Sequence, residues 1–399
     1  MYSLLLAIIY VAFISLGLPD SLVGAGWPVM HGDLGVPVSF AGIITMIIAA
    51  STILSSLASE RMTRRFGAGP VTAVSVGMTA AALGGFSMSG EFWMLCLWAI
   101  PYGLGAGAVD AALNNYIALH YAARHMNWLH GCWGVGAAIS PFIMSFALTA
   151  EWGWPRAYLI VAVIQAVLTV FLFLSLPLWR RVNTMTPPDT HEEDVEEAPR
   201  AGHVPLGQAL RIPGVLLILT AFFAYCGVES TAILWASTFL VNDRGVDVAT
   251  AAAFGALFLL GITAGRFLAG FVADRVGDVA LIRGGFLSVL VAGALIALPL
   301  ENPALTLFGL VLAGLGCAPV YPAIIHSTPA NFGRRNSQAI IGIQMAAAYS
   351  GSTLMPPLFG AVSAWSGLWV FPLFILVLAL LGLGMSERLN RLVRARQGG

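Results

Sequence analysis

Long apolar stretches dominate the chain, and each reaches about 20 residues or more, the length that a helix needs to cross a hydrocarbon core of about 30 Å. Twelve such stretches predict twelve membrane-spanning helices, at residues 3–30, 36–58, 68–89, 92–121, 127–149, 156–178, 213–241, 248–272, 280–299, 304–330, 336–362 and 367–386. With 58% hydrophobic and 10% charged residues, the chain is unlike a soluble domain of 399 residues. We expect an all-α integral membrane protein.

The arginines predict how the chain lies in the membrane. All nineteen basic residues are arginine, and sixteen of them fall on one side if the N-terminus is cytoplasmic. Only Arg156 and Arg244 fall outside, and Arg266 lies within a span. This asymmetry follows the positive-inside rule, so we expect both termini in the cytoplasm. The first span lacks a basic segment before it, which indicates a retained helix rather than a cleaved signal peptide.

Several function classes are not expected. The cysteines stand singly in apolar runs, without the CxxC spacing of a metal or redox site, at Cys96, Cys132, Cys226 and Cys317. The sequence contains no phosphate-binding loop of the kind that hydrolyses ATP. We therefore expect no enzyme activity, no bound metal or cofactor and no nucleic-acid partner.

A polar segment divides the chain. Between Trp179 and Arg211 the hydrophobic pattern stops, and two prolines accompany an acidic cluster of Asp189, Glu192, Glu193, Asp194, Glu196 and Glu197. Such a composition cannot bury a core. We predict a cytoplasmic linker at 184–211 between two six-helix bundles, 1–183 and 212–399.

The two predicted bundles repeat one another. Three features recur at separations of 211, 215 and 214 residues, namely Gly103-Leu104-Gly105 with Gly314-Leu315-Gly316, Gly136 and Pro141 with Gly351 and Pro356, and Phe40 to Arg61 with Phe254 to Arg275. The glycines predict close contacts between helices. A duplicated six-helix unit that encloses a site at mid-membrane is a transporter design.

Three carboxylates, Asp20, Asp110 and Glu229, lie inside predicted spans. A charge at mid-bilayer costs about 2.5–3.5 kcal/mol on insertion scales, so such residues normally face a cavity or a partner. Burial disfavours the charged form, and a bound proton or cation relieves that cost. We predict that these three acids carry proton coupling, with packing against the backbone as the structural alternative.

Helical spacing places candidate ligand contacts near these acids. Asn114 lies one turn after Asp110, Tyr225 one turn before Glu229, and Trp27 two turns after Asp20. Further candidates are His130, Trp133, Tyr321 and Gln344. Carboxylates, amides and aromatic rings suit a polyhydroxylated solute. Trp27 equally suits an interfacial belt, and a lone histidine such as His130 is more often a packing residue.

Arg266 stands about 12 Å along its helix from the cytoplasmic end. Its guanidinium either snorkels to the interface or pairs with an acid, and snorkelling is the favoured interpretation.

Two short motifs resemble the major facilitator superfamily. Residues 270–277, Gly-Phe-Val-Ala-Asp-Arg-Val-Gly, look like its G-x-x-x-D-R-x-G loop, and residues 59–65 are a degenerate copy with Glu60 for aspartate. The resemblance implies two six-helix bundles that work by alternating access. It also implies that Glu60, Arg61, Asp274 and Arg275 form gating latches, which pair in one state and part in the other.

A narrower resemblance is to the fucose/proton symporter family. Residues 103–116 are similar to its G-x-G-x-x-[ED]-x-x-x-N-P-[YF] pattern, although Asn115 replaces the proline. Residues 316–322 resemble its G-x-A-P-x-[YF]-P, residues 225–229 resemble Y-x-G-x-E, and Asp20 stands in the place of its buried aspartate. In the superfamily the first helix of each three-helix repeat lines the cavity, and the three acids fall on three of these four helices.

These observations favour a secondary transporter that imports a small polar solute, a sugar or similar, by proton-coupled symport. Sodium is the alternative coupling ion, since carboxylates and carbonyls also hold Na⁺. We expect a monomer in the lipid bilayer of a bacterial inner membrane. A second hypothesis is proton-coupled efflux of drugs or metabolites, and a third is a transporter-like receptor or lipid scramblase.

Overall fold

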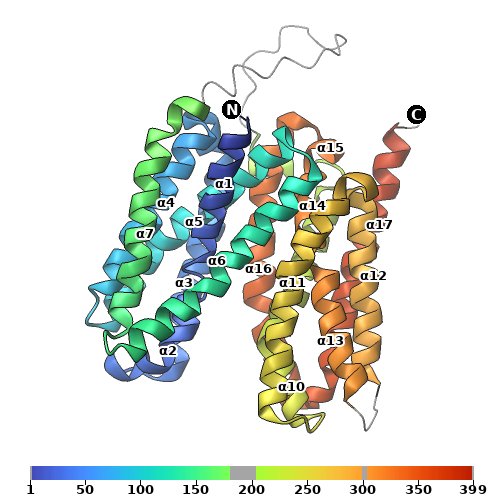
Figure 1. The fold of residues 1–399 in the computed structure, drawn as a ribbon. Helices are drawn as coiled ribbons and strands as arrows, with labels where there is room; N and C mark the ends of the chain where they lie inside the picture. Colours follow the sequence, from blue (N-terminus) through green and yellow to red (C-terminus); the bar gives the residue numbers. More distant parts are fainter. Residues whose placement is uncertain (1, 180–203, 299–302, 398–399) are drawn as a thin grey trace. The chain divides into compact units, whose positions relative to one another are not determined.

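The computed structural model describes residues 2–179, 204–298 and 303–397, and these residues are built from α-helices with two short 3-10 turns (Figure 1). Eleven helical stretches among them are long and apolar enough to cross a membrane. The predicted span at 336–362 lies within α16 (Arg334–Ser366), a continuous helix whose many polar residues keep it out of that set. The all-α prediction is confirmed, with eleven to twelve spans.

The chain forms two compact units. The first comprises Met1–Tyr116 and Cys132–Leu206, and the second comprises Ile117–Gly131 and Gly207–Gly399. Residues 117–131 thus belong with the second unit, although they precede the end of the first. The predicted division into 1–183 and 212–399 stays a prediction, because most of the predicted linker and its whole acidic cluster lie outside the described residues.

The first unit is a bundle in which α4 packs along α7. Its core contains Trp27, Phe86 and Tyr158, and the last two rings meet edge to face with centroids 5.3 Å apart. The helices that contribute to it are α1 (Tyr2–Gly17), α2 (Leu22–Asp33), α3 (Ala41–Phe66), α4 (Ala68–Ser87), α5 (Phe92–His120), α6 (Ala123–Thr149) and α7 (Trp154–Leu174).

The second unit is built around α10, which packs along both α16 and α17. Asp247 caps the next helix, where its carboxylate accepts a hydrogen bond from the Thr250 backbone N–H at 2.9 Å, and this bond lowers the pKa of the Asp247 carboxyl. Besides α16, its helices are α9 (Leu206–Ala209), α10 (Val215–Asn242), α11 (Val248–Val276), α12 (Asp278–Ala297), α13 (Ala304–Cys317), α14 (Val320–His326), α15 (Thr328–Phe332) and α17 (Phe371–Gln397).

Two of the predicted spans are interrupted. The span at 3–30 divides because α1 ends at Gly17 and α2 begins at Leu22, with Pro19 between them. Proline has no N–H for the helical hydrogen bond and its ring clashes with the preceding turn, which accounts for the break. The span at 304–330 divides in the same way beside Pro319, between α13 and α14. Asp20 therefore lies in a turn and not within a helix.

The two motifs that were predicted to be loops are helical. Residues 59–65 lie in the last turns of α3, and residues 270–276 lie in the last turns of α11. The connections themselves are single glycines, Gly67 with φ 86° and Gly277 with φ 81°. At the accompanying ψ values of 159° and 155° this backbone region is essentially restricted to glycine.

Glycines at equivalent positions of the predicted repeat make equivalent helix–helix contacts in the two units. A Cβ on Gly103 of α5 would meet the Ile48 carbonyl oxygen of α3. A Cβ on Gly314 of α13 would meet the Phe258 carbonyl oxygen of α11. The close approach that these glycines predict is confirmed within each unit.

Candidate functional site

Asp20 lies in the turn between α1 and α2, where its carboxylate accepts two hydrogen bonds. The Tyr102 hydroxyl of α5 donates to Oδ1 at 2.7 Å, and the Trp133 indole N–H of α6 donates to Oδ2 at 2.9 Å. Both donors are neutral, and Asp20 is an exposed residue. The carboxylate is thus held in place without a cation among these contacts.

The position of Trp133 follows from a close contact between α1 and α6. A Cβ on Gly17 would meet the Trp133 carbonyl oxygen, and a Cβ on Gly136 would meet the Ile14 carbonyl oxygen. Only glycine allows the two backbones to approach so closely. The Trp133 indole is thereby brought to the end of α1, beside Asp20.

Asp110 and Asn114 form a second polar pair within α5. The Asn114 amide donates to Asp110 Oδ1 at 2.8 Å, as the four-residue spacing predicts. Both residues are buried in the first unit. A buried carboxylate with an amide neighbour offers a ligand both an acceptor and a donor.

Glu229 of α10 has a different environment, because it pairs with a cation. Arg266 of α11 approaches Glu229 Oε1 with an Nη2 distance of 3.4 Å, and the Tyr225 hydroxyl donates to Oε2 at 2.5 Å. Arg266 is only 2% exposed. The favoured expectation that Arg266 snorkels to the interface is wrong, because Arg266 is buried and the Glu229 carboxylate compensates its charge within the helix bundle.

Aromatic rings surround this ion pair inside the second unit. The Arg266 guanidinium carbon lies 6.0 Å from the centroid of the Tyr321 ring. The same ring lies 4.6 Å from His130 and 4.6 Å from Phe222, and 6.2 Å from Tyr225. Three predicted site residues, His130, Tyr225 and Tyr321, are therefore gathered around one charge pair.

Two predicted site residues have other surroundings. Trp27 lies in the hydrophobic core of the first unit, where its indole N–H donates to the Val38 carbonyl at 2.6 Å. The prediction that Trp27 shares a helix face with Asp20 is wrong, because Asp20 lies in the turn before α2 and not within a helix. Gln344 is fully buried in α16, and its Oε1 accepts a hydrogen bond from the Thr328 hydroxyl at 3.0 Å.

The predicted latch residues differ in their partners. Asp274 forms an ion pair with Arg124, and it also accepts a hydrogen bond from the Arg124 backbone N–H at 3.0 Å. Both residues belong to the second unit. Glu60 lies 3.9 Å from Arg64 of its own helix. Arg61 and Arg275 are exposed.

Tyr102, a partner of Asp20, is not among the predicted site residues. The two residues are 82 positions apart, so no helical spacing connects them. The break at Pro19 was a signal that the sequence did contain.

Comparison with known proteins identifies the family. The family model described as Major Facilitator Superfamily matches residues 9–300 and 217–393. "Bypass of stop codon protein 6" of Saccharomyces cerevisiae is 22% identical over 395 residues, which cover 93% of this chain and 79% of the yeast protein. The class B tetracycline resistance protein of Escherichia coli is 24% identical over 355 residues, covering 86% and 85% of the two chains.

A solved structure shares the fold. The Escherichia coli fucose:proton symporter FucP superposes with a TM-score of 0.74 at 14% identity, over 97% of this chain and 99% of that chain. The family match agrees with the helical arrangement and with the glycine contacts that recur in the two units. The chain belongs to the major facilitator superfamily, whose members are multi-pass secondary transporters of small solutes and not enzymes.

Proposed function

We propose that this transporter moves a small polar solute, with sugars as the leading class, by proton-coupled symport and alternating access. Support comes from the polar groups of each unit, which are the Asp110–Asn114 pair and the Glu229–Arg266 pair with its aromatic neighbours. Paired donors and acceptors beside flat rings suit hydroxyl groups and the C–H faces of a sugar ring. Asn114, Trp133, His130, Tyr225 and Tyr321 are the proposed ligand contacts.

The neutral surroundings of the Asp20 carboxylate are the observation that supports proton coupling. Its two hydrogen-bond donors are neutral, so a proton on Asp20 neutralises an uncompensated charge. Glu229 already has Arg266 as its counter-ion. We therefore assign the coupling proton first to Asp20, with Asp110 as a further acceptor, and assign Glu229 to ligand binding as well as coupling.

The ion pair of Asp274 with Arg124 supports a latch at this motif. An exposed pair of this kind contributes little stability and is easily exchanged, as a conformational latch requires. We place the protein in a bacterial inner membrane with both termini cytoplasmic, on the arginine distribution, and we propose that it works as a monomer.

Proton-coupled efflux is the second candidate function. The similarity to the class B tetracycline resistance protein favours it, as does the aromatic cluster of Phe222, Tyr225 and Tyr321. Four polar groups, those of Asp110, Asn114, Glu229 and Arg266, weigh against a purely hydrophobic cargo.

Proteoliposomes containing the full chain test both candidates. Sugars, organic acids and drugs are added singly, and the external pH is recorded in sodium-free buffer. Symport predicts alkalinisation outside when the solute is added. With one proton per solute, a pH difference of one unit sustains about tenfold accumulation, because one unit corresponds to about 1.4 kcal/mol.

The variants Asp20→Asn, Asp110→Asn and Glu229→Gln connect that flux to the acids. We expect Asp20→Asn to carry solute only down its gradient. Dye extrusion driven by an imposed pH gradient would instead establish efflux. If all three amide variants concentrate solute as well as the parent does, proton coupling by these acids is excluded.

A further inference from the structure

The break in the first span leaves a backbone carbonyl without its ordinary donor. In an α-helix the carbonyl of Ser15 accepts from the N–H four residues later, and that residue is Pro19, which has none. Ser15 is buried, so water does not substitute freely. The helix end that leads to Asp20 therefore needs a donor from elsewhere.

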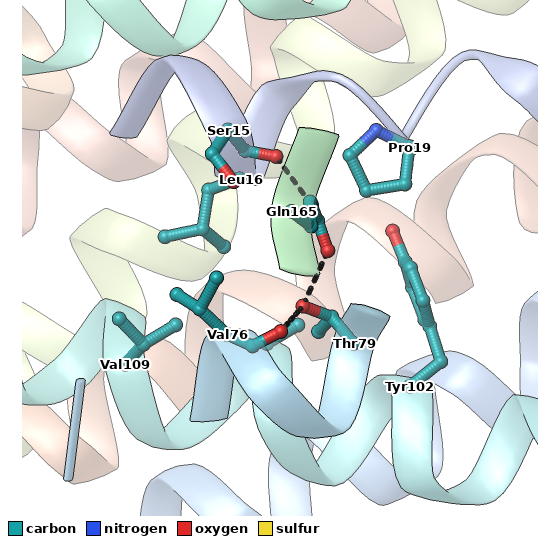
Figure 2. Close-up of a pocket in the computed structure, with 9 residues that line it drawn as sticks. Ser15, Leu16, Pro19, Val76, Thr79, Tyr102, Val109 and Gln165 are labelled. Atoms are coloured by element: carbon teal, nitrogen blue, oxygen red, sulfur yellow. Dashed lines mark hydrogen bonds between the residues drawn. The ribbon is translucent and has the colours of Figure 1, made fainter. Parts of the chain in front are cut away.

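Gln165 of α7 supplies that donor. Its Nε2 donates to the Ser15 carbonyl at 2.7 Å, and its Oε1 accepts from the Thr79 hydroxyl of α4 at 2.7 Å. Figure 2 shows the Gln165 side chain between these two partners, with a hydrogen bond at each end. Gln165 is 1% exposed. A polar side chain buried in the apolar α7 is costly, which indicates a specific role.

The end of α1 packs closely against α6 at Gly17, but its other side is not completely filled. A small cavity lies beside it, lined among others by Ser15, Pro19, Tyr102 and Gln165 (Figure 2). The volume of this cavity is ≈ 10 Å³, which is space for about one water molecule. Tyr102, which also lines this cavity, donates to Asp20. Through its two hydrogen bonds, Gln165 connects the end of α1 to α4, next to the turn in which Asp20 accepts from Tyr102.

We propose that Gln165 is a positioning residue for Asp20: its amide replaces the missing N–H of Pro19 and holds the broken helix at the geometry that Tyr102 and Trp133 require. The hydrogen bond itself is independent of transport. Its consequence for uptake rests on the proposed role of Asp20 in proton coupling.

A stability cycle on the full chain in detergent tests the hydrogen bond. Gln165→Leu is expected to lower the unfolding temperature by about 2–4 °C. Pro19→Ala provides a backbone N–H that is able to serve the Ser15 carbonyl. In the Pro19→Ala background, Gln165→Leu is therefore expected to have less than half its effect in the parent. Equal effects in the two backgrounds would show that the amide does not replace the proline N–H.

The pH dependence of uptake in proteoliposomes tests the positioning role. Tyr102→Phe removes a donor to the Asp20 carboxylate, so half-maximal uptake is expected to move to higher pH. Gln165→Leu should move it in the same direction, by about half a pH unit or more, since the donors lose their alignment. Thr169→Val is the control, because its hydroxyl donates to the Gln165 backbone carbonyl, one turn away on α7, and not to the Gln165 side chain.

Each outcome decides the proposal. An unchanged pH midpoint in Gln165→Leu, with uptake still measurable, would reduce Gln165 to a structural residue. A parent protein whose uptake is independent of pH would overturn the proposed function and this positioning role with it. In that case the stability cycle still reports whether the amide replaces the proline N–H.

Discussion

Asp20 and Glu229 are both acids in apolar stretches, yet their surroundings differ in the charge of the partner. Asp20 lies exposed in a turn of the first unit and is held by the neutral Tyr102 and Trp133. Glu229 lies in a continuous helix of the second unit and is paired with the buried Arg266. A proton therefore removes an uncompensated charge at Asp20, whereas at Glu229 it would leave Arg266 without a counter-ion.

An acid in an apolar stretch therefore has one of two roles, either to bind a proton or to pair with a buried cation. A carboxylate with neutral donors changes protonation without leaving an opposite charge behind. A carboxylate with a buried cation is coupled to it, because removing either partner exposes the other charge to a low dielectric. The following three experiments measure that distinction.

Breaking the buried pair is expected to have the largest effect. Glu229→Gln leaves the buried Arg266 without its counter-ion, and we expect a loss of about 3–5 kcal/mol in the free energy of unfolding. Arg266→Met leaves Glu229, whose side chain is 14% exposed, and the loss should be smaller. The double variant Glu229→Gln with Arg266→Met should recover most of that loss. Thermal unfolding in detergent measures all three, and a double variant less stable than both single variants would contradict the interpretation.

Asp20→Asn is the matching change in the first unit, and its effect on stability should be smaller. The amide oxygen still accepts one hydrogen bond, so the expected loss is about 1 kcal/mol. Uptake should become insensitive to pH. The contrast between the two acids fails if Asp20→Asn destabilises the protein as much as Glu229→Gln does.

Arg124→Gln is expected to have the smallest effect on stability. The side chains of Arg124 and Asp274 are 50% and 26% exposed, so their ion pair is screened and contributes about 0–1 kcal/mol. Raising the salt concentration should reduce even this difference. A loss comparable to that of Arg266→Met would mean that exposure does not distinguish the Arg124–Asp274 pair from the Arg266–Glu229 pair.

The sequence predicts helices well because the length of an apolar run decides a span. It also predicts the Asp110–Asn114 contact, since both residues lie on one helix at a fixed spacing. Matched glycines predict the close contacts of α5 with α3 and of α13 with α11. In each case the deciding information is local or is repeated along the chain.

Contacts between distant helices escape that reasoning. Glu229 and Arg266 are 37 residues apart and Asp20 and Tyr102 are 82 apart, so only packing brings each pair together. The break of the first span at Pro19 is difficult to predict for a different reason. Twelve apolar runs predict twelve uninterrupted helices, and a proline alone does not locate a break, because Pro101 and Pro141 lie inside continuous helices.

Gly67 in the first unit and Gly277 in the second are articulations of the same design. Since a single residue joins the helices on either side, its two backbone rotations decide how those helices cross, and there is no slack to absorb a change. The angle between α3 and α4, and that between α11 and α12, is therefore set at one residue, and a side chain at either position would restrict it.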